Sequence, residues 1–371
     1  MATARTFVEE LLKKADVTIG GGRPQDITVH DERLYNRVVR YGTLGLGEAY
    51  MDGWWDANAL DVFFYTVLRA QLEKHFKINF ASVLTIAKAF IFNLQSGKNA
   101  FTVGKEHYDL GNDLYEAMLD SRMVYSCGYW ESAQTLDEAQ QAKLDLICRK
   151  VGLKEGDRIL DIGCGWGSFA KYAAEKHGAS VVGITVSKEQ AALARDRCKG
   201  LPVEIRFQDY RELDEKFDHI ISIGMFEHVG VKNYRDYFKV ANRCLKEDGL
   251  FLLHTIGYKV SQLTSDPWTV KYIFPGGALP SIAQIGKAIE NLFIVEDLHN
   301  FGADYDKTLM AWFTNFDIAW PNLKEKYGDR FYRMWKYYLL SCAGLARARE
   351  MQLWQIVLSQ KGVSGGYTSV R

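Results

Sequence analysis

From about residue 140 onward, short apolar runs alternate with amphipathic stretches. Five runs have the length and pattern of buried strands, at 158–162, 180–186, 203–208, 219–223 and 250–256. Helical patterns fill the segments between them, and this alternation predicts an α/β fold, a parallel sheet covered by helices on both faces. Two later runs, 293–298 and 353–359, are interpreted as further strands, the last of them pairing at the sheet edge.

The first hundred residues have a different, mainly helical pattern. Apolar spacing predicts helices over 7–14, 44–55, 60–76 and 80–94, with a turn at 20–24. Two domains are expected, because 371 residues exceed one average domain. The expected division is a helical, membrane-associated N-terminal domain over 1–95, a linker over 96–106 and a catalytic domain over 107–371.

Basic and large apolar side chains are interleaved between Thr66 and Lys105. Six basic residues there face one acid, Glu73, and five phenylalanines share the stretch. This combination suits the surface of an anionic bilayer. A helix packed on the second domain, with its lysines in water, explains the same pattern equally well.

Composition narrows the choice of partners. The 46 basic and 46 acidic residues cancel, so no nucleic acid or other polyanion is indicated. None of the six cysteines has the spacing of a zinc or redox motif, so we expect no metal, and reduced thiols indicate a cytoplasmic protein. The N-terminus lacks the pattern of a signal peptide, and the most apolar window, 78–94, is interrupted by polar residues, so we expect no membrane span.

A glycine-rich turn follows the first strand of the second domain. In RILDIGCGWG the strand ends at Asp161, and Gly163, Gly165 and Gly167 lead into a helix at Ser168. Glycine lets the backbone turn sharply and approach a ligand closely, and ligands bind beyond the carboxyl ends of parallel strands. Glycine at every second residue differs from the dinucleotide fingerprint and better suits a nucleoside with a charged amino-acid tail.

The next two strands also end in polar residues. Thr185 stands where many enzymes of this fold carry an acid for ribose hydroxyls, and Gln190 can both donate and accept in that role. The alternative is an exposed glutamine at a helix start. After the third strand come Gln208, Asp209 and Tyr210, which offer a carboxylate for an adenine amino group and a ring to stack on it. The alternative for Asp209 is to cap the following turn.

Long motifs of the chain resemble those of the cyclopropane-fatty-acyl-phospholipid synthases and their relatives, the mycolic acid cyclopropane synthases. The resemblance covers nearly the whole chain and implies a Rossmann-like, seven-stranded S-adenosylmethionine-dependent methyltransferase sheet with a smaller helical N-terminal domain. The stretches that carry it include HYDLGNDLYEAMLD at 107–120, MVYSCGYW at 123–130, LDIGCGWGSFA at 160–170, SIGMFEHVG at 222–230, DPWTVKYIFPGGALPS at 266–281 and HNFGADYDKTLMAW at 299–312.

The resemblance implies transfer of a methyl group from S-adenosylmethionine to a cis double bond of a phospholipid acyl chain, giving a cyclopropane and S-adenosylhomocysteine. It implies bicarbonate as the base, held by residues that match Cys127, Glu227, His254, Ile256 and Tyr305. Family contacts to the methyl donor fall on Tyr125, Ser126, Gly163, Gly165, Thr185, Gln190, Asp209 and Tyr210. Implied partners are an unsaturated phospholipid bilayer, met peripherally at the inner membrane surface, and a second copy of the chain.

This chemistry explains the residue types. An alkene attacks a sulfonium methyl only in a dry, aligned site, and the resulting carbocation is stabilised by aromatic faces. Candidate rings, each of which could equally be hydrophobic core, are Tyr125, Tyr129, Trp130, Phe226, Phe274, Tyr305 and Trp312. Ring closure then needs a base. Glu227 and His254 are expected to follow strand ends, where a histidine can donate to an anion and a glutamate can orient it.

Two alternatives remain at this point. A related lipid or small-molecule methyltransferase would share the glycine turn and make a branched methyl product. A non-catalytic lipid-binding protein would keep the fold and bind no S-adenosylhomocysteine.

Overall fold

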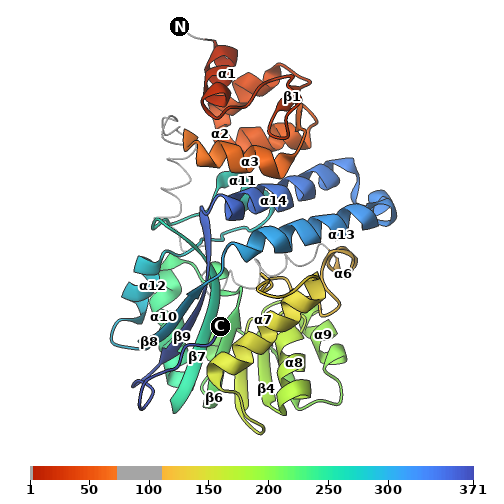
Figure 1. Ribbon diagram of the computed structural model, residues 1–371. Coiled ribbons are helices and arrows are strands. Elements are labelled where there is room, and N and C mark those ends of the chain that lie inside the picture. Colours follow the sequence, from red (N-terminus) through yellow and green to blue (C-terminus); the bar gives the residue numbers. More distant parts are fainter. Residues whose placement is uncertain (1–2, 73–110) are drawn as a thin grey trace. The chain divides into compact units, whose positions relative to one another are not determined.

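The computed structural model describes residues 3–72 and 111–371, which form two compact units (Figure 1). The sheet unit comprises residues 111–263, 276–304 and 352–371, and the helical unit comprises residues 3–72, 264–275 and 305–351. The expected domain boundaries at residues 95 and 107 lie outside the described residues. Two later segments of the expected catalytic domain belong to the helical unit.

The sheet unit contains one seven-stranded sheet in the order β5-β4-β3-β6-β7-β9-β8. Strands β3 to β7 are parallel, and β8 and β9 are antiparallel to each other. The predicted strands are all present, with ends shifted by a few residues. Their bounds are β3 Arg158–Ile162, β4 Ser180–Thr185, β5 Val203–Phe207, β6 Phe217–Ile223, β7 Leu245–Tyr258, β8 Ile294–Asn300 and β9 Met351–Ser359.

The prediction that the last strand lies at the sheet edge is wrong. β9 lies between β7 and β8, and β8 forms the edge. Burial explains the order, because nearly every side chain of β9 is buried whereas Ile294, Val295 and Leu298 of β8 are exposed. A nearly continuous apolar run such as LWQIVLS fits an interior strand covered on both faces.

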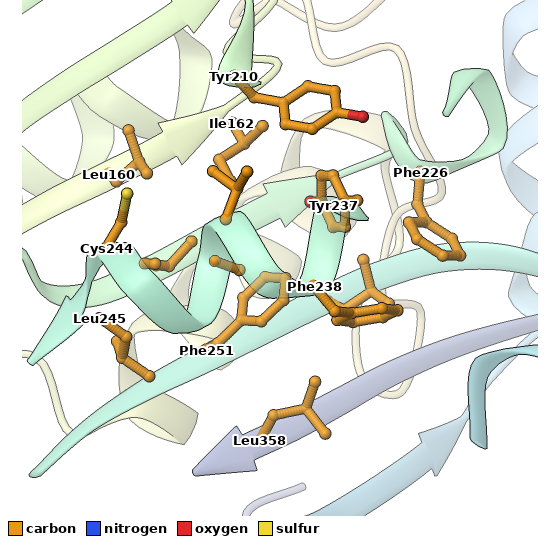
Figure 2. Close-up of a cluster of buried hydrophobic side chains, with 14 of the residues drawn as sticks. Leu160, Ile162, Tyr210, Phe226, Tyr237, Phe238, Cys244, Leu245, Phe251 and Leu358 are labelled. Carbon is orange, nitrogen blue, oxygen red and sulfur yellow. The ribbon is translucent and has the colours of Figure 1, made fainter. Parts of the chain in front are cut away.

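Alternate residues of the strands enter two separate cores. Leu160 and Ile162 belong to a core that includes Phe238 and Phe251 (Figure 2), whereas Ile159 packs in a core on the other face. Helices α10 and α12 cover the first face, and α7 and α8 cover the second. The α-helices of this unit are α6 Asn112–Met118, α7 Leu136–Val151, α8 Ser168–His177, α9 Lys188–Arg197, α10 Tyr234–Cys244 and α12 Ile282–Ile289.

The helical unit is built from three separate segments of the chain. Helix α3 packs along α14, where Gly344 allows close approach to the α3 backbone at Asp61 and Arg347 pairs with the Asp61 carboxylate at 2.8 Å. A two-stranded antiparallel sheet, β1 Ile27–Val29 with β2 Trp55–Ala57, completes the unit. Its helices are α1 Ala4–Lys14, α2 Arg33–Met51, α3 Leu60–Arg69, α11 Pro267–Tyr272, α13 Asp304–Tyr327 and α14 Asp329–Arg347.

Two helix predictions for this unit need correction. α3 ends at Arg69, earlier than the predicted 60–76 helix, because Gln71 adopts a positive φ of 53°. The helix predicted over 44–55 is the second half of α2, which is bent at Gly42 and stops at Met51 before β2. The predicted 80–94 helix, the linker and most of the basic, aromatic segment lie outside the described residues. Within the described residues, no helix is both long and apolar enough to span a bilayer.

Candidate active site

The glycine turn connects β3 to α8 in a backbone conformation that glycine adopts easily. Gly163, Gly165 and Gly167 have φ values of 81°, 53° and 80°. A Cβ atom at Gly163 would lie 2.6 Å from the Met225 side chain, so this position excludes a larger residue by contact as well as by conformation. No atom lies within 4 Å of the Cβ position at Gly165, which faces open space.

A pocket of about 170 Å³ lies against this turn, at the carboxyl ends of β3, β4 and β5. Gly167 is not among its lining residues and instead precedes the first residue of α8. The structure thus gathers nearly all the residues expected to contact the methyl donor around one space. Those that line it are Tyr125, Ser126, Asp161, Gly163, Gly165, Thr185, Gln190, Gln208, Asp209 and Tyr210.

The end of β4 is joined to the start of α9 by hydrogen bonds. Thr185 Oγ1 donates to Gln190 Oε1 at 2.9 Å and accepts from the Ser187 backbone N–H at 3.2 Å. Ser187 caps α9 through the Gln190 backbone N–H. Gln190 is therefore buried and held in place, which contradicts the alternative of an exposed helix-start glutamine.

Asp209 caps the turn that follows β5, as one of the two interpretations expected. Its Oδ1 accepts the Arg211 backbone N–H at 2.9 Å, and its Oδ2 accepts the Arg211 guanidinium at 2.8 Å. The same guanidinium lies 4.6 Å from the centre of the Tyr210 ring, whose edge contacts Tyr237. These contacts hold the Asp209 carboxylate and the Tyr210 ring at the pocket wall. Both groups line the pocket and can also contact a ligand there.

Buried charges lie beneath the glycine turn. Asp161 is 2% exposed, its Oδ2 has no hydrogen-bond partner among the described residues, and burial raises its pKa to about 7. Lys143 of α7 is fully buried, and its Nζ donates to Ser126 Oγ at 2.9 Å. Burial lowers the pKa of Lys143 to about 8, against the opposing effect of Asp120 and Asp161.

Glu227 lies in a short 3-10 helix, Phe226–His228, that follows β6. Its Oε1 accepts the backbone N–H of Ile256 at 2.6 Å, which links two residues of the predicted bicarbonate set. Oε2 has no partner among the described residues, although Glu227 is buried. Burial raises its pKa to about 7, and the Ile256 N–H works in the opposite direction.

His254 lies within β7, opposite Ile223 at the end of β6, and not after a strand end as expected. β7 does not end at His254. It continues to Tyr258, past the point where its parallel neighbour β6 ends. Gln355 Nε2 of β9 lies 3.4 Å from His254 Nδ1, and when the amide donates this contact the proton of the neutral imidazole is on Nε2. His254 Nε2 and Gln355 Oε1 are both without a partner among the described residues, and burial holds the pKa of His254 well below its usual range.

The two remaining residues of the predicted bicarbonate set lie in different units. Cys127 is fully buried in the sheet unit, and its Sγ lies 3.2 Å from the Gly128 carbonyl oxygen, to which the thiol donates. Tyr305 begins the helical unit's part of α13, where its ring meets Trp312 edge to face. Four of the five residues therefore belong to the sheet unit. No metal-binding group of His, Cys, Asp and Glu occurs among residues 3–72 and 111–371.

Several polar residues of this region had not been predicted. Lys143 and Gln140 had a detectable signal, because both occupy the buried stripe of α7 with Ala139 and Ile147. Charged and amide side chains at such positions stand out against an apolar helix face. Gln355 is a similar polar break in the apolar run of β9, but its position beside His254 depends on the strand order.

Comparison with protein families matches residues 95–356 to the family described as mycolic acid cyclopropane synthetase. Cyclopropane-fatty-acyl-phospholipid synthase from Escherichia coli (strain K12) is 56% identical over 365 residues, 98% of this chain and 95% of that protein. A probable fatty acid methyltransferase from Pseudomonas putida is 40% identical over 251 residues, 64% of each chain.

Solved structures agree with these matches. A cyclopropane synthase from Mycobacterium tuberculosis has a TM-score of 0.65 and 32% identity, covering 70% of this chain and 97% of that one. A mycolic acid cyclopropane synthase solved in complex with SAH and CTAB has the same TM-score, 34% identity and the same coverage. The chain belongs to the mycolic acid cyclopropane synthetase family and is an enzyme with the fold of the S-adenosylmethionine-dependent methyltransferases.

Proposed function

We propose that this enzyme transfers a methylene group from S-adenosylmethionine to the cis double bond of an acyl chain in a membrane phospholipid. The alkene carbon forms a bond to the methyl group as the sulfur–methyl bond breaks, which leaves S-adenosylhomocysteine and a carbocation on the acyl chain. Loss of one proton from the added methyl group then closes the cyclopropane ring. The observation that carries the proposal is a set of three buried polar atoms of the sheet unit without a hydrogen-bond partner among the described residues, Glu227 Oε2, His254 Nε2 and Gln355 Oε1.

The pocket at the glycine turn is the proposed donor site. Gly163 and Gly165 let the backbone approach the ligand, and Thr185 with Gln190 supplies hydroxyl and amide groups for ribose. Asp209 and Tyr210 provide a carboxylate and a ring face for adenine. This assignment is supported by the family's complex with SAH, at 34% identity over 70% of this chain.

Buried polar atoms of the sheet unit fit a small oxyanion such as bicarbonate. Neutral His254 carries a proton on Nε2 that can be donated to an anion, and Glu227 Oε2 can accept from a hydroxyl of that anion. Backbone donation by Ile256 keeps the Glu227 carboxylate oriented. When bound, bicarbonate would supply the base for the proton lost in ring closure.

One aromatic ring packs against the imidazole of His254, and a second ring packs against the first. Phe301 lies 5.8 Å from it, centre to centre, and Tyr129 lies 5.3 Å from Phe301. Such rings exclude water, which would trap a carbocation as an alcohol, and their faces attract the positive charge. Tyr129 was among the predicted rings, whereas Phe301 was not.

We propose further that the enzyme works as a homodimer in peripheral contact with the inner membrane surface. The basic, aromatic stretch between Thr66 and Lys105 would supply the contact, since its charge and apolar side chains match an anionic bilayer. Sedimentation of the protein with anionic vesicles and its mass in solution test these two points separately.

The reaction is tested with vesicles of a cis-monounsaturated phospholipid and a methyl-labelled donor. Mass spectrometry should show the gain of one methylene group per modified chain, and proton NMR should show the upfield signals of ring protons. Vesicles of the fully saturated phospholipid are the control and should gain no label. A labelled, methyl-branched lipid without ring protons would replace this proposal by the branched-product alternative.

The proposed bicarbonate site has its own test. Glu227→Gln keeps the acceptor for Ile256 and removes the carboxylate, so turnover should fall by about 10²-fold or more while S-adenosylhomocysteine still binds. In degassed, carbonate-free buffer the wild-type enzyme should slow and recover on addition of bicarbonate. Turnover that is unchanged in both experiments would remove the anion from the mechanism.

A further inference from the structure

Lys143 is a buried cation whose hydrogen-bonding capacity is mostly unused. The side chain comes from α7, is fully buried and lines the pocket at the glycine turn. Lysine is almost never buried to this extent without a paired charge. An ammonium group has three donors, and among the described residues Nζ makes one hydrogen bond, to Ser126 Oγ.

Two carboxylates, those of Asp120 and Asp161, lie near enough to raise the pKa of Lys143. The two carboxylates differ in their hydrogen bonds. Asp120 accepts the backbone N–H groups of Val124 at 2.8 Å and Arg122 at 3.1 Å. Asp161 lines the same pocket as Lys143, and its Oδ2 has no partner within residues 3–72 and 111–371. Both carboxylates favour the charged ammonium, so with its pKa of about 8 Lys143 is mainly protonated at neutral pH.

We propose that Lys143 binds the carboxylate of the amino-acid tail of the methyl donor, while Asp161 binds its ammonium group. The pocket then offers one buried charge of each sign to a zwitterion that carries both. The inference rests on the proposed function, because it takes the donor as the ligand of this pocket. It adds a specificity-determining residue that selects a donor with an intact amino-acid tail.

A purely structural role is the competing explanation. Gln140 Nε2 donates to the Ser126 carbonyl oxygen at 2.8 Å, so α7 already holds the segment before Cys127 from one side. Lys143 could act only as a second tie to that segment, through Ser126 Oγ. Its loss would then weaken every ligand of the pocket to the same degree, which makes the two roles distinguishable.

Calorimetry on the full-length protein with three ligands distinguishes carboxylate binding by Lys143 from a purely structural role. S-adenosylhomocysteine has the whole tail, its decarboxylated analogue lacks only the carboxylate, and 5′-methylthioadenosine lacks the tail. Wild-type protein should bind S-adenosylhomocysteine about ten- to hundred-fold more tightly than the decarboxylated analogue. In Lys143→Met this preference should largely disappear, with methylthioadenosine affinity changed by less than about three-fold.

Lys150→Met is the matched control. Lys150 lies on the same helix and is also buried, but it pairs with Asp297 at 3.6 Å and does not line the pocket. Its replacement should keep the preference for the carboxylate. Equal binding of the three ligands by wild-type protein would overturn the inference, and this measurement does not depend on whether Lys143→Met folds. An equal loss of affinity for all three ligands in a folded Lys143→Met variant would overturn it as well. No binding of S-adenosylhomocysteine at all would instead contradict the proposed function.

Discussion

Asp161 and Glu227 are carboxylates that the fold keeps away from water, and both have a pKa of about 7. Burial is the main cause in each case, because neither carboxylate has a full set of hydrogen-bond donors. An enzyme uses such residues near neutral pH, where they accept or release a proton readily. The same burial has a measurable effect on stability.

Glu227→Gln should make the folded protein more stable at pH 8 by about 1–3 kcal/mol while it lowers turnover. The folded-state pKa of Glu227 lies above its ordinary value of 4.5, so the folded wild-type protein holds a proton that the unfolded chain has lost. Wild-type stability therefore falls as pH rises from 4.5 to 7, and the amide removes this loss. Urea unfolding at pH 5, 6 and 8 measures the difference, which should shrink toward pH 5.

Glu175→Gln is the control for this measurement. Glu175 is exposed on α8 and pairs with Lys171, itself partly exposed, at 3.8 Å. Its replacement should change stability by about 0.5 kcal/mol or less at every pH. A Glu227→Gln effect that is equally flat across pH would mean that the carboxylate is not buried as described.

At this scale, sequence reasoning found residues that belong to motifs and missed residues that act through neighbours. Asp161 and the glycines follow from the turn itself, and the family resemblance pointed to Glu227 and His254. Gln355 becomes relevant only through the place of β9 beside β7, which no local pattern contains. Lys143 had a signal in the buried stripe of α7, but a helical period alone does not identify the charge it meets.

The position of β9 between β7 and β8 is the main feature at the scale of elements. It brings Gln355 to His254 and packs Trp354 against Gly257 of β7. A Cβ atom at Gly257 would lie 1.9 Å from the Trp354 ring, so this pair of strands can close only because residue 257 has no side chain. The alternation of apolar runs predicted each strand, yet it contained no information on the order of the last two.

Gly257→Ala should therefore destabilise the protein by about 1–3 kcal/mol and reduce turnover, because the Trp354 ring must move and Gln355 with it. The control is Gly286→Ala on the exposed side of α12. Among the described residues, no neighbouring atom lies within 4 Å of the position that its Cβ atom would take. That change should raise stability by about 0.5–1 kcal/mol, since alanine favours a helix. Thermal unfolding of the two variants compares them, and equal shifts in both would contradict the described packing of β7 and β9.

At the scale of the whole molecule, the chain crosses between its two units more than once. Residues 264–275 and 305–351 belong to the helical unit, although they lie far along the sequence from its first helices. The expected division into 1–95, a linker and 107–371 stays a prediction, and it followed from the one change in the pattern of apolar runs along the chain. Sequence patterns detect such a change but not the partner that a later helix will pack against.

A chain restricted to residues 107–371 tests this arrangement. It would lack α2 and α3, the helices that cover α14, and would expose an apolar face around Gly344 and leave Arg347 without Asp61. We expect it to bind a hydrophobic dye and to lose a sharp unfolding transition. Full-length Arg347→Ala is the control, since it removes the ion pairs of Arg347 with Asp61 and Asp306 but keeps α2 and α3, and it should stay compact. A truncated chain that unfolds as sharply as the full-length protein would contradict the description of the helical unit.

The division of the helical unit into three segments affects how the protein is made. Its first helices are synthesised before the sheet, but α14, against which α3 packs, begins at Asp329, whereas α3 begins at Leu60. During that interval the side of α3 that packs on α14 lacks this partner, and long-range contacts of this kind form slowly. A chaperone that shields this nascent helix would therefore raise the yield of folded enzyme more than one that acts only after the chain is released.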